Sequence, residues 1–241
     1  MAIELFQETN IRQLVRLRDL DRLRAYRENL DFYHGLQWPG GPRRRERRLT
    51  FNYAKVLIDK VSSYLMSSLD FAVDPAEGTG SDEARRAEEA LYQVYDDNNL
   101  ELLDLETEID TAILGDGCFK VLWDAREGRV RVTSPDVQGL YAWWVGDDPG
   151  RVRRVASRYQ LEAAEVRETY GQRPAAASAE VIEVWTAEEF QVWLDGILRR
   201  QEANPYGFIP FVIYPNLRAP KSFWGVSDIP VVREAAVELN R

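Results

Sequence analysis

The chain has very little of two side chains on which much protein chemistry depends. Its 241 residues include one cysteine, Cys118, and one histidine, His34. A single cysteine forms no internal disulfide, so a reducing compartment is expected, and Cys118 is expected to be a buried structural thiol. One histidine and one cysteine are too few for a His/Cys zinc site. His34 stands in a Tyr-His-Gly sequence typical of a helix end, which makes it a poor catalytic base.

Long apolar runs and phosphate-binding loops are also missing. The longest apolar run, at 208–214, is far short of the roughly 20 residues that span a bilayer. The first ten residues lack the basic-then-apolar pattern of a signal peptide. No G-x-x-x-x-G-K-[ST] sequence is present, so a P-loop is not expected. The chain is therefore expected to stay in the cytoplasm where it is made, with no cofactor and no membrane contact.

The charge is acidic on average and basic in one place. The formal net charge is -9, and an acidic surface repels nucleic-acid phosphates. The exception is a run of arginines after a turn-rich stretch: Arg43, Arg44, Arg45, Arg47 and Arg48. Three interpretations stay open: contact with an acidic surface of a neighbouring subunit, a solvated loop, or non-specific phosphate binding. Five phosphate contacts would give a salt slope of about -4.5.

The many carboxylates raise the possibility of a metal-dependent nuclease, because two-metal chemistry needs clustered acids. The adjacent pairs Asp96-Asp97 and Asp147-Asp148 are, however, typical of solvated loop charges. Pro135-Asp136 lacks the downstream E-x-K of a restriction-type nuclease core. We assign no catalytic or metal-binding residue, and a metal-dependent nuclease or other DNA-processing protein stays the alternative.

The first half of the chain has the period of helices. Helices are predicted over 14–33, capped by Thr9 or Asn10 and ended by Gly35, and over 52–68, with a short strand at 69–73. A third helix begins with Ser81 as its N-cap, and a fourth covers 100–114 and stops at a glycine turn.

After residue 117 the period changes to that of strands. Strands are predicted at 118–123, 129–133, 140–145, 151–159, 180–186, 189–194 and 197–202, with a helix at 161–170 and a hairpin turn at Asp195-Gly196. The run 208–214 contains Pro210, so an edge strand or an irregular segment is expected there. A last helix starts at Ile229, capped by Ser227 or Asp228, and no Gly or Pro stops it. Helices followed by an antiparallel meander predict an α+β fold.

The tail has a pattern that resembles portal proteins of tailed bacteriophages, of the siphophage type. It reads Asn204-Pro205-x-Gly207-x-Ile209-Pro210-Phe211-Val212, then Pro215-Asn216, Gly225-x-Ser227-Asp228-Ile229 and a helix ending Leu239-Asn240. Three upstream pieces are similar to the same family in the same order. They are YRENLDFYHG with Tyr33 and Gly35, Leu49-x-x-Asn52 before a helix, and Ala112-x-x-Gly115-x-Gly117 before a hairpin. The resemblance covers about residues 26–241 and corresponds to the N-terminal portion of the family.

The resemblance implies a structural subunit without catalytic activity, in a ring that is usually a dodecamer at one capsid vertex. Double-stranded DNA passes through such a ring during packaging and ejection. The implied partners are further copies of the chain, capsid and scaffolding proteins, the terminase large subunit and a head–tail connector protein. The implied location is the virion, after assembly in the host cytoplasm. The implied domains are a wing-like α+β domain over 1–225 and the start of a stem helix over 226–241, with clip, remaining stem and crown outside this chain.

Overall fold

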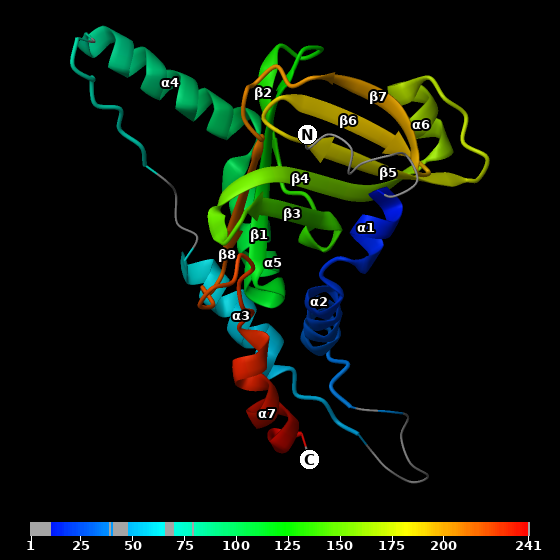
Figure 1. The fold of residues 1–241 in the computed structure, drawn as a ribbon. Helices are drawn as coiled ribbons and strands as arrows, with labels where there is room; N and C mark the ends of the chain where they lie inside the picture. Colours follow the sequence, from blue (N-terminus) through cyan, green and yellow to red (C-terminus); the bar gives the residue numbers. More distant parts are fainter. Residues whose placement is uncertain (1–10, 39, 41–47, 66–69, 79, 241) are drawn as a thin grey trace. The chain divides into compact units, whose positions relative to one another are not determined.

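The computed structural model describes residues 11–38, 40, 48–65, 70–78 and 80–240, which form an α+β fold (Figure 1). The chain divides into two compact units that are each described by themselves. Unit 1 comprises Met1–Ala25, Pro135–Phe211 and Lys221–Phe223, and unit 2 comprises Tyr26–Ser134, Val212–Pro220 and Trp224–Arg241. The predicted division into 1–225 and 226–241 rests on the resemblance and stays a prediction.

Unit 1 is built on an antiparallel sheet with the strand order β3-β4-β5-β6-β7. The strands are β3 (Leu140–Val145), β4 (Asp148–Glu162), β5 (Ser178–Trp185), β6 (Glu189–Leu194) and β7 (Ile197–Ala203). A 3-10 turn, η1 (Val137–Gly139), precedes β3, and α6 (Ala163–Tyr170) joins β4 to β5. The predicted hairpin turn joins β6 to β7, with positive φ angles of 50° at Asp195 and 81° at Gly196. The predicted meander is thus confirmed.

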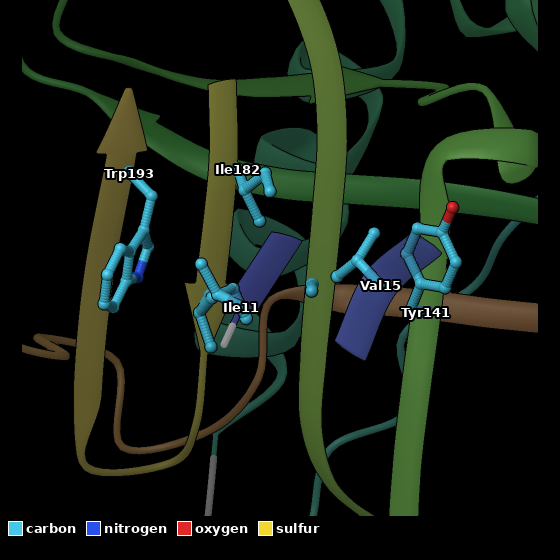
Figure 2. Packing of buried hydrophobic residues seen from close by; sticks show 7 residues of the cluster. Ile11, Val15, Tyr141, Ile182 and Trp193 are labelled. Atoms are coloured by element: carbon cyan, nitrogen blue, oxygen red, sulfur yellow. The ribbon is translucent and has the colours of Figure 1, made fainter. Parts of the chain in front are cut away.

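The core of unit 1 lies between this sheet and α1 (Ile11–Leu17), as Figure 2 shows. Ile11 and Val15 of α1 pack with Tyr141 of β3, Ile182 of β5 and Trp193 of β6. These five side chains are at most 1% exposed. Burial of the three aliphatic ones, Ile11, Val15 and Ile182, contributes roughly 1.5–3 kcal/mol each.

The single helix predicted over 14–33 is wrong, because the structure has α1 and a separate α2 (Leu20–Tyr33). Asp19 between them has a φ of 56°. Arg18 donates a hydrogen bond of 2.7 Å to the carbonyl of Ala142 and its guanidinium lies 4.7 Å from the ring centroid of Trp143. These contacts with β3 hold the break, and leucines recur across it at helical spacing, so the pattern does not reveal it. The predicted caps Thr9 and Asn10 lie outside the described residues.

Unit 2 combines helices with a three-stranded sheet. Its helices are the later part of α2, α3 (Tyr53–Leu65), α4 (Ser81–Asp97), α5 (Leu100–Leu114) and α7 (Ile229–Leu239). The sheet has the order β2-β1-β8, formed by β2 (Arg129–Thr133), β1 (Asp116–Asp124) and β8 (Phe211–Pro215). The expected edge strand is confirmed in β8, which begins directly after Pro210.

Two predicted features of unit 2 are wrong. Residues 70–73 form no strand, because α4 side chains occupy their backbone donors: Phe71 N–H bonds to the Tyr92 hydroxyl at 3.3 Å and Val73 N–H to a Glu88 carboxylate oxygen at 2.9 Å. The N-cap of α4 is Gly80 rather than Ser81, and no side chain caps it. Residue 69 lies outside the described part of the chain.

Candidate functional site

Amide side chains join the ends of α2, α3 and α7 in unit 2. Asn52 donates to the Tyr33 carbonyl at 2.7 Å and accepts from Gln37 Nε2 at 3.1 Å. Asn240 donates to Gln37 Oε1 at 2.7 Å and accepts from Phe51 N–H at 2.8 Å. We call Tyr33, Gln37, Asn52 and Asn240 the amide junction. It joins three residues of the phage-like pattern through Gln37, a buried residue that the sequence analysis missed.

A charged cluster reinforces the same helix ends. The Tyr33 hydroxyl donates to Asp59 at 2.6 Å, and Lys55 Nζ donates to the Tyr33 hydroxyl at 2.6 Å and to Asp59 at 2.8 Å. The bond to Asp59, and then the bond to Tyr33, raise the pKa of Lys55. Burial tends to raise the pKa of Asp59, but the bonds from Lys55 and Tyr33 outweigh it and lower that pKa. Gly35 forms the turn that follows α2, with a φ of 86°.

A second cluster brings the glycine turn after α5 against the segment before α7. Gly115 has a φ of 106°, and its carbonyl accepts from Asn216 N–H at 2.8 Å. A Cβ at Gly115 would lie 2.8 Å from the Ser227 nitrogen, and one at Gly225 would lie 2.6 Å from Pro215 Cβ. We call Gly115, Gly117, Gly225, Ser227 and Asp228 the glycine junction. Side chains other than hydrogen do not fit at these glycine positions unless the backbone moves.

Two polar side chains fix the glycine junction from inside. Asp116 is 1% exposed, and its carboxylate accepts from Gly225 N–H at 2.8 Å and from the Tyr26 hydroxyl. The Ser227 hydroxyl donates to the Ala112 carbonyl at 3.0 Å and accepts from Ile229 N–H at 3.0 Å. Ser227 therefore supplies the side-chain cap of α7, as one of the two predicted caps.

The other residues around the glycine junction confirm a close-packed site. Asp228 is the N-cap residue by position but makes no side-chain cap bond, and its carboxylate accepts from Asn216 at 3.0 Å. A Cβ at Gly117 would lie 2.5 Å from Cζ of Tyr214. Burial raises the pKa of Tyr214 to about 12. The sequence predicts a turn at Gly115-Asp116-Gly117, but nothing in its pattern reveals the role of Asp116.

The remaining residues of the pattern form a turn in unit 1 after β7. Asn204 Nδ2 donates to the carbonyls of Thr186 and Phe208, both at 2.7 Å, and Asn204 Oδ1 accepts from Tyr206 N–H at 3.0 Å. Gly207 has a φ of 69°. Pro205 and Pro210 flank this turn. The bonds of Asn204 account for its place in the pattern as a turn organiser.

The arginine run is described only at its end. Arg43, Arg44, Arg45 and Arg47 lie outside the described residues. Arg48 donates to the Gly40 carbonyl at 2.7 Å, and its guanidinium lies 5.3 Å from the Trp38 ring centroid. A subunit contact, a solvated loop and phosphate binding all stay open for the run.

Helix α3 carries an apolar surface that the described residues of its own unit leave open. Its buried residues are Ala54, Ile58 and Ser62. A separate stripe is exposed by 43–73%: Tyr53, Val56, Leu57, Val61 and Tyr64. We call these five residues the α3 outer face. They present on the order of 500 Å² of mostly apolar surface, at the upper end of what monomers usually expose, and such patches often bind a partner.

Cys118 and His34 are the single cysteine and the single histidine of the chain. Cys118 is buried, as predicted, and burial raises the pKa of its thiol to about 12. His34 is exposed, and its ring lies 5.4 Å from that of Tyr33. Within the described ranges, no group of three or more His, Cys, Asp or Glu side chains is arranged to hold a metal ion. No helix in that same part of the chain combines the length and apolar character needed to cross a membrane.

Comparison with known proteins adds no identification. No model of a known protein family matches the chain, and no curated protein matches it either. The functional interpretation therefore depends on the geometry of the two junctions, the α3 outer face and the resemblance of the motifs.

Proposed function

We propose that this chain is a structural subunit of a phage portal ring. Such a ring, usually a dodecamer, occupies one capsid vertex of the virion and forms the channel for packaging and ejection of double-stranded DNA. The terminase large subunit, head–tail connector, capsid and scaffolding proteins are its partners.

One observation carries the proposal: motif residues far apart in the sequence depend on each other in the fold. Asn240 is joined to Asn52 through Gln37, which hydrogen-bonds to both over separations of 203 and 15 residues. Ser227 bonds to Ala112 over 115 residues. A chance set of short matches would have no reason to converge in this way. Their convergence supports one common architectural pattern.

The chemistry of these residues also supports a structural role. The amide junction uses amide side chains to satisfy backbone groups. The glycine junction uses glycines, the Ser227 hydroxyl and the Asp116 carboxylate for the same purpose. The α3 outer face offers a neighbouring subunit an apolar surface, as a heterologous ring contact requires. The net charge of -9 favours movement of DNA past the subunit over tight binding.

Mass photometry and negative-stain imaging of the complete gene product test the proposal. Closed rings of the complete protein are expected, far larger than the 27.8 kDa of this chain alone. The double variant Leu57→Gln and Tyr64→Gln should shift the population to monomer. Ile197→Gln, at a side chain that is 54% exposed on β7, is the matched control and should assemble like the parent.

Two results would count against a portal subunit. The first is a complete gene product that is strictly monomeric at every accessible concentration. The second is cleavage of plasmid DNA with Mg²⁺ or Mn²⁺ that is lost on substitution of one carboxylate, which would establish the nuclease alternative.

A further inference from the structure

A groove of about 400 Å³ lies in unit 2 between α4, α5 and the β2-β1-β8 sheet. Leu91 and Val94 of α4 line one wall, Leu100 of α5 another, and Val121 of β1 and Val132 of β2 form the sheet side. The lining is almost entirely apolar, so water inside it has few hydrogen-bond partners. Such a concave apolar surface is suited to accept side chains from outside.

The groove is open because α4 covers its own apolar side incompletely. The only α4 residue classed as buried is Ala84, although apolar residues recur along one face of the helix. Leu91 is 49% exposed, Val121 36% and Val212 of the edge strand β8 58%. The described residues of unit 2 therefore leave apolar walls in contact with solvent.

The helical side of the groove belongs to a strongly acidic stretch of the sequence. Residues 70–110 contain fourteen Asp and Glu residues and two arginines, Arg85 and Arg86. Arg85 pairs with Glu89 within α4 at 3.3 Å. Asp104 is the acidic residue of the lining, and burial raises its pKa. Burial also raises the pKa of Glu108 on the next turn, and the charge of Asp228 adds to the effect. A cation near these carboxylates would relieve both effects.

We propose that this groove binds a basic amphipathic segment of another protein. Apolar side chains of the segment enter the groove, and its lysines and arginines face the acidic residues of α4 and α5. This mode combines helix-in-groove packing with charge complementarity. Anionic lipids and nucleic acids are disfavoured because the same carboxylates repel them. The inference uses neither the α3 outer face nor the portal assignment, so a failed test of the proposed function leaves it unaffected.

Fluorescence anisotropy with the full chain tests the inference. The probe is a labelled 18-residue peptide with leucines at helical i, i+3, i+4 and i+7 positions and lysines elsewhere. A second peptide has the same leucines with glutamates in place of lysines. The lysine peptide should bind at least tenfold more tightly than the glutamate peptide, and its affinity should fall several-fold when salt is raised.

Variants locate the binding. Leu91→Gln with Val121→Gln should weaken binding of the lysine peptide about tenfold, and Asp104→Asn should reduce its salt dependence. All three side chains are partly exposed, so these variants are expected to fold. Leu57→Gln with Tyr64→Gln on the α3 outer face is the matched control and should bind as the parent does.

Three outcomes would overturn the proposal. They are equal binding of the two peptides, unchanged binding by the groove variants, or displacement of the lysine peptide by decanoate at a lower concentration than by unlabelled peptide. A fourth outcome would assign the groove to a second copy of the chain instead. In that outcome the affinity for the peptide falls as the concentration of the chain is raised.

Discussion

Gly115→Ala should destabilise unit 2 far more than a glycine substitution elsewhere at positive φ. Two costs add at Gly115. Its φ of 106° is one that a side chain disfavours, for about 1–2 kcal/mol. The new Cβ would also lie 2.8 Å from the Ser227 nitrogen and 3.0 Å from the Val226 carbonyl carbon, which are backbone atoms that cannot rotate away. Overpacking of this kind costs about 1–3 kcal/mol, so the total is about 2–5 kcal/mol.

Gly128→Ala separates the two costs. Gly128 has a φ of 66°, but a Cβ there would meet nothing within 4 Å. Only the conformational cost of about 1–2 kcal/mol applies. Urea unfolding gives the loss of stability in each variant. Hydrogen exchange in peptides from α5 and α7 then shows whether that loss falls in unit 2. Equal losses of stability in the two variants would refute the close approach of residues 225–227 to the α5 turn.

Two further predictions concern unit 2. Asn240→Ala should lower the free energy of unfolding by about 1–2 kcal/mol, because Phe51 N–H and Gln37 each lose a hydrogen-bond partner. Amide hydrogens of α7 should then exchange faster. An unchanged exchange rate would place the end of α7 outside the amide junction. Asp104→Asn should raise the urea midpoint at pH 7 and lose this advantage below about pH 3.9, because a carboxyl whose pKa burial raises opposes folding only once it is ionised. A gain in midpoint that is equal at both pH values would contradict the burial argument.

Strong local signals made much of the fold predictable. The helix at 100–114, the strands at 129–133, 140–145 and 189–194, and the start of the last helix at Ile229 agree with the structure. Each has a period that differs from its neighbours and a turn residue at its boundary. Gly115 is an example, since a helix end in the left-handed region requires glycine and the sequence supplies it.

Sequence patterns do not predict a local structure that a distant partner decides. The helix predicted over 14–33 is interrupted at Asp19 because Arg18 donates a hydrogen bond to a carbonyl on β3, 124 residues away. Residues 70–73 resemble a strand, but α4 side chains occupy their donors. Gln37 and Asp116 are ordinary polar residues in the sequence, and only the fold shows that Gln37 holds the amide junction and Asp116 the glycine junction. Periodicity contains no information on such partners, because it reports the face of an element and not its neighbour.

The order of strands in unit 2 has a consequence for synthesis. Strand β1 ends at Asp124, but its neighbour β8 begins at Phe211. Translation at about 5–20 residues per second separates the two by on the order of ten seconds. During that interval an edge of β1 has no native partner, and Asn240 has not yet been made to join α7 to Phe51. Nascent chains are therefore most prone to edge-to-edge aggregation in this window, so slower synthesis should lower the yield of soluble protein.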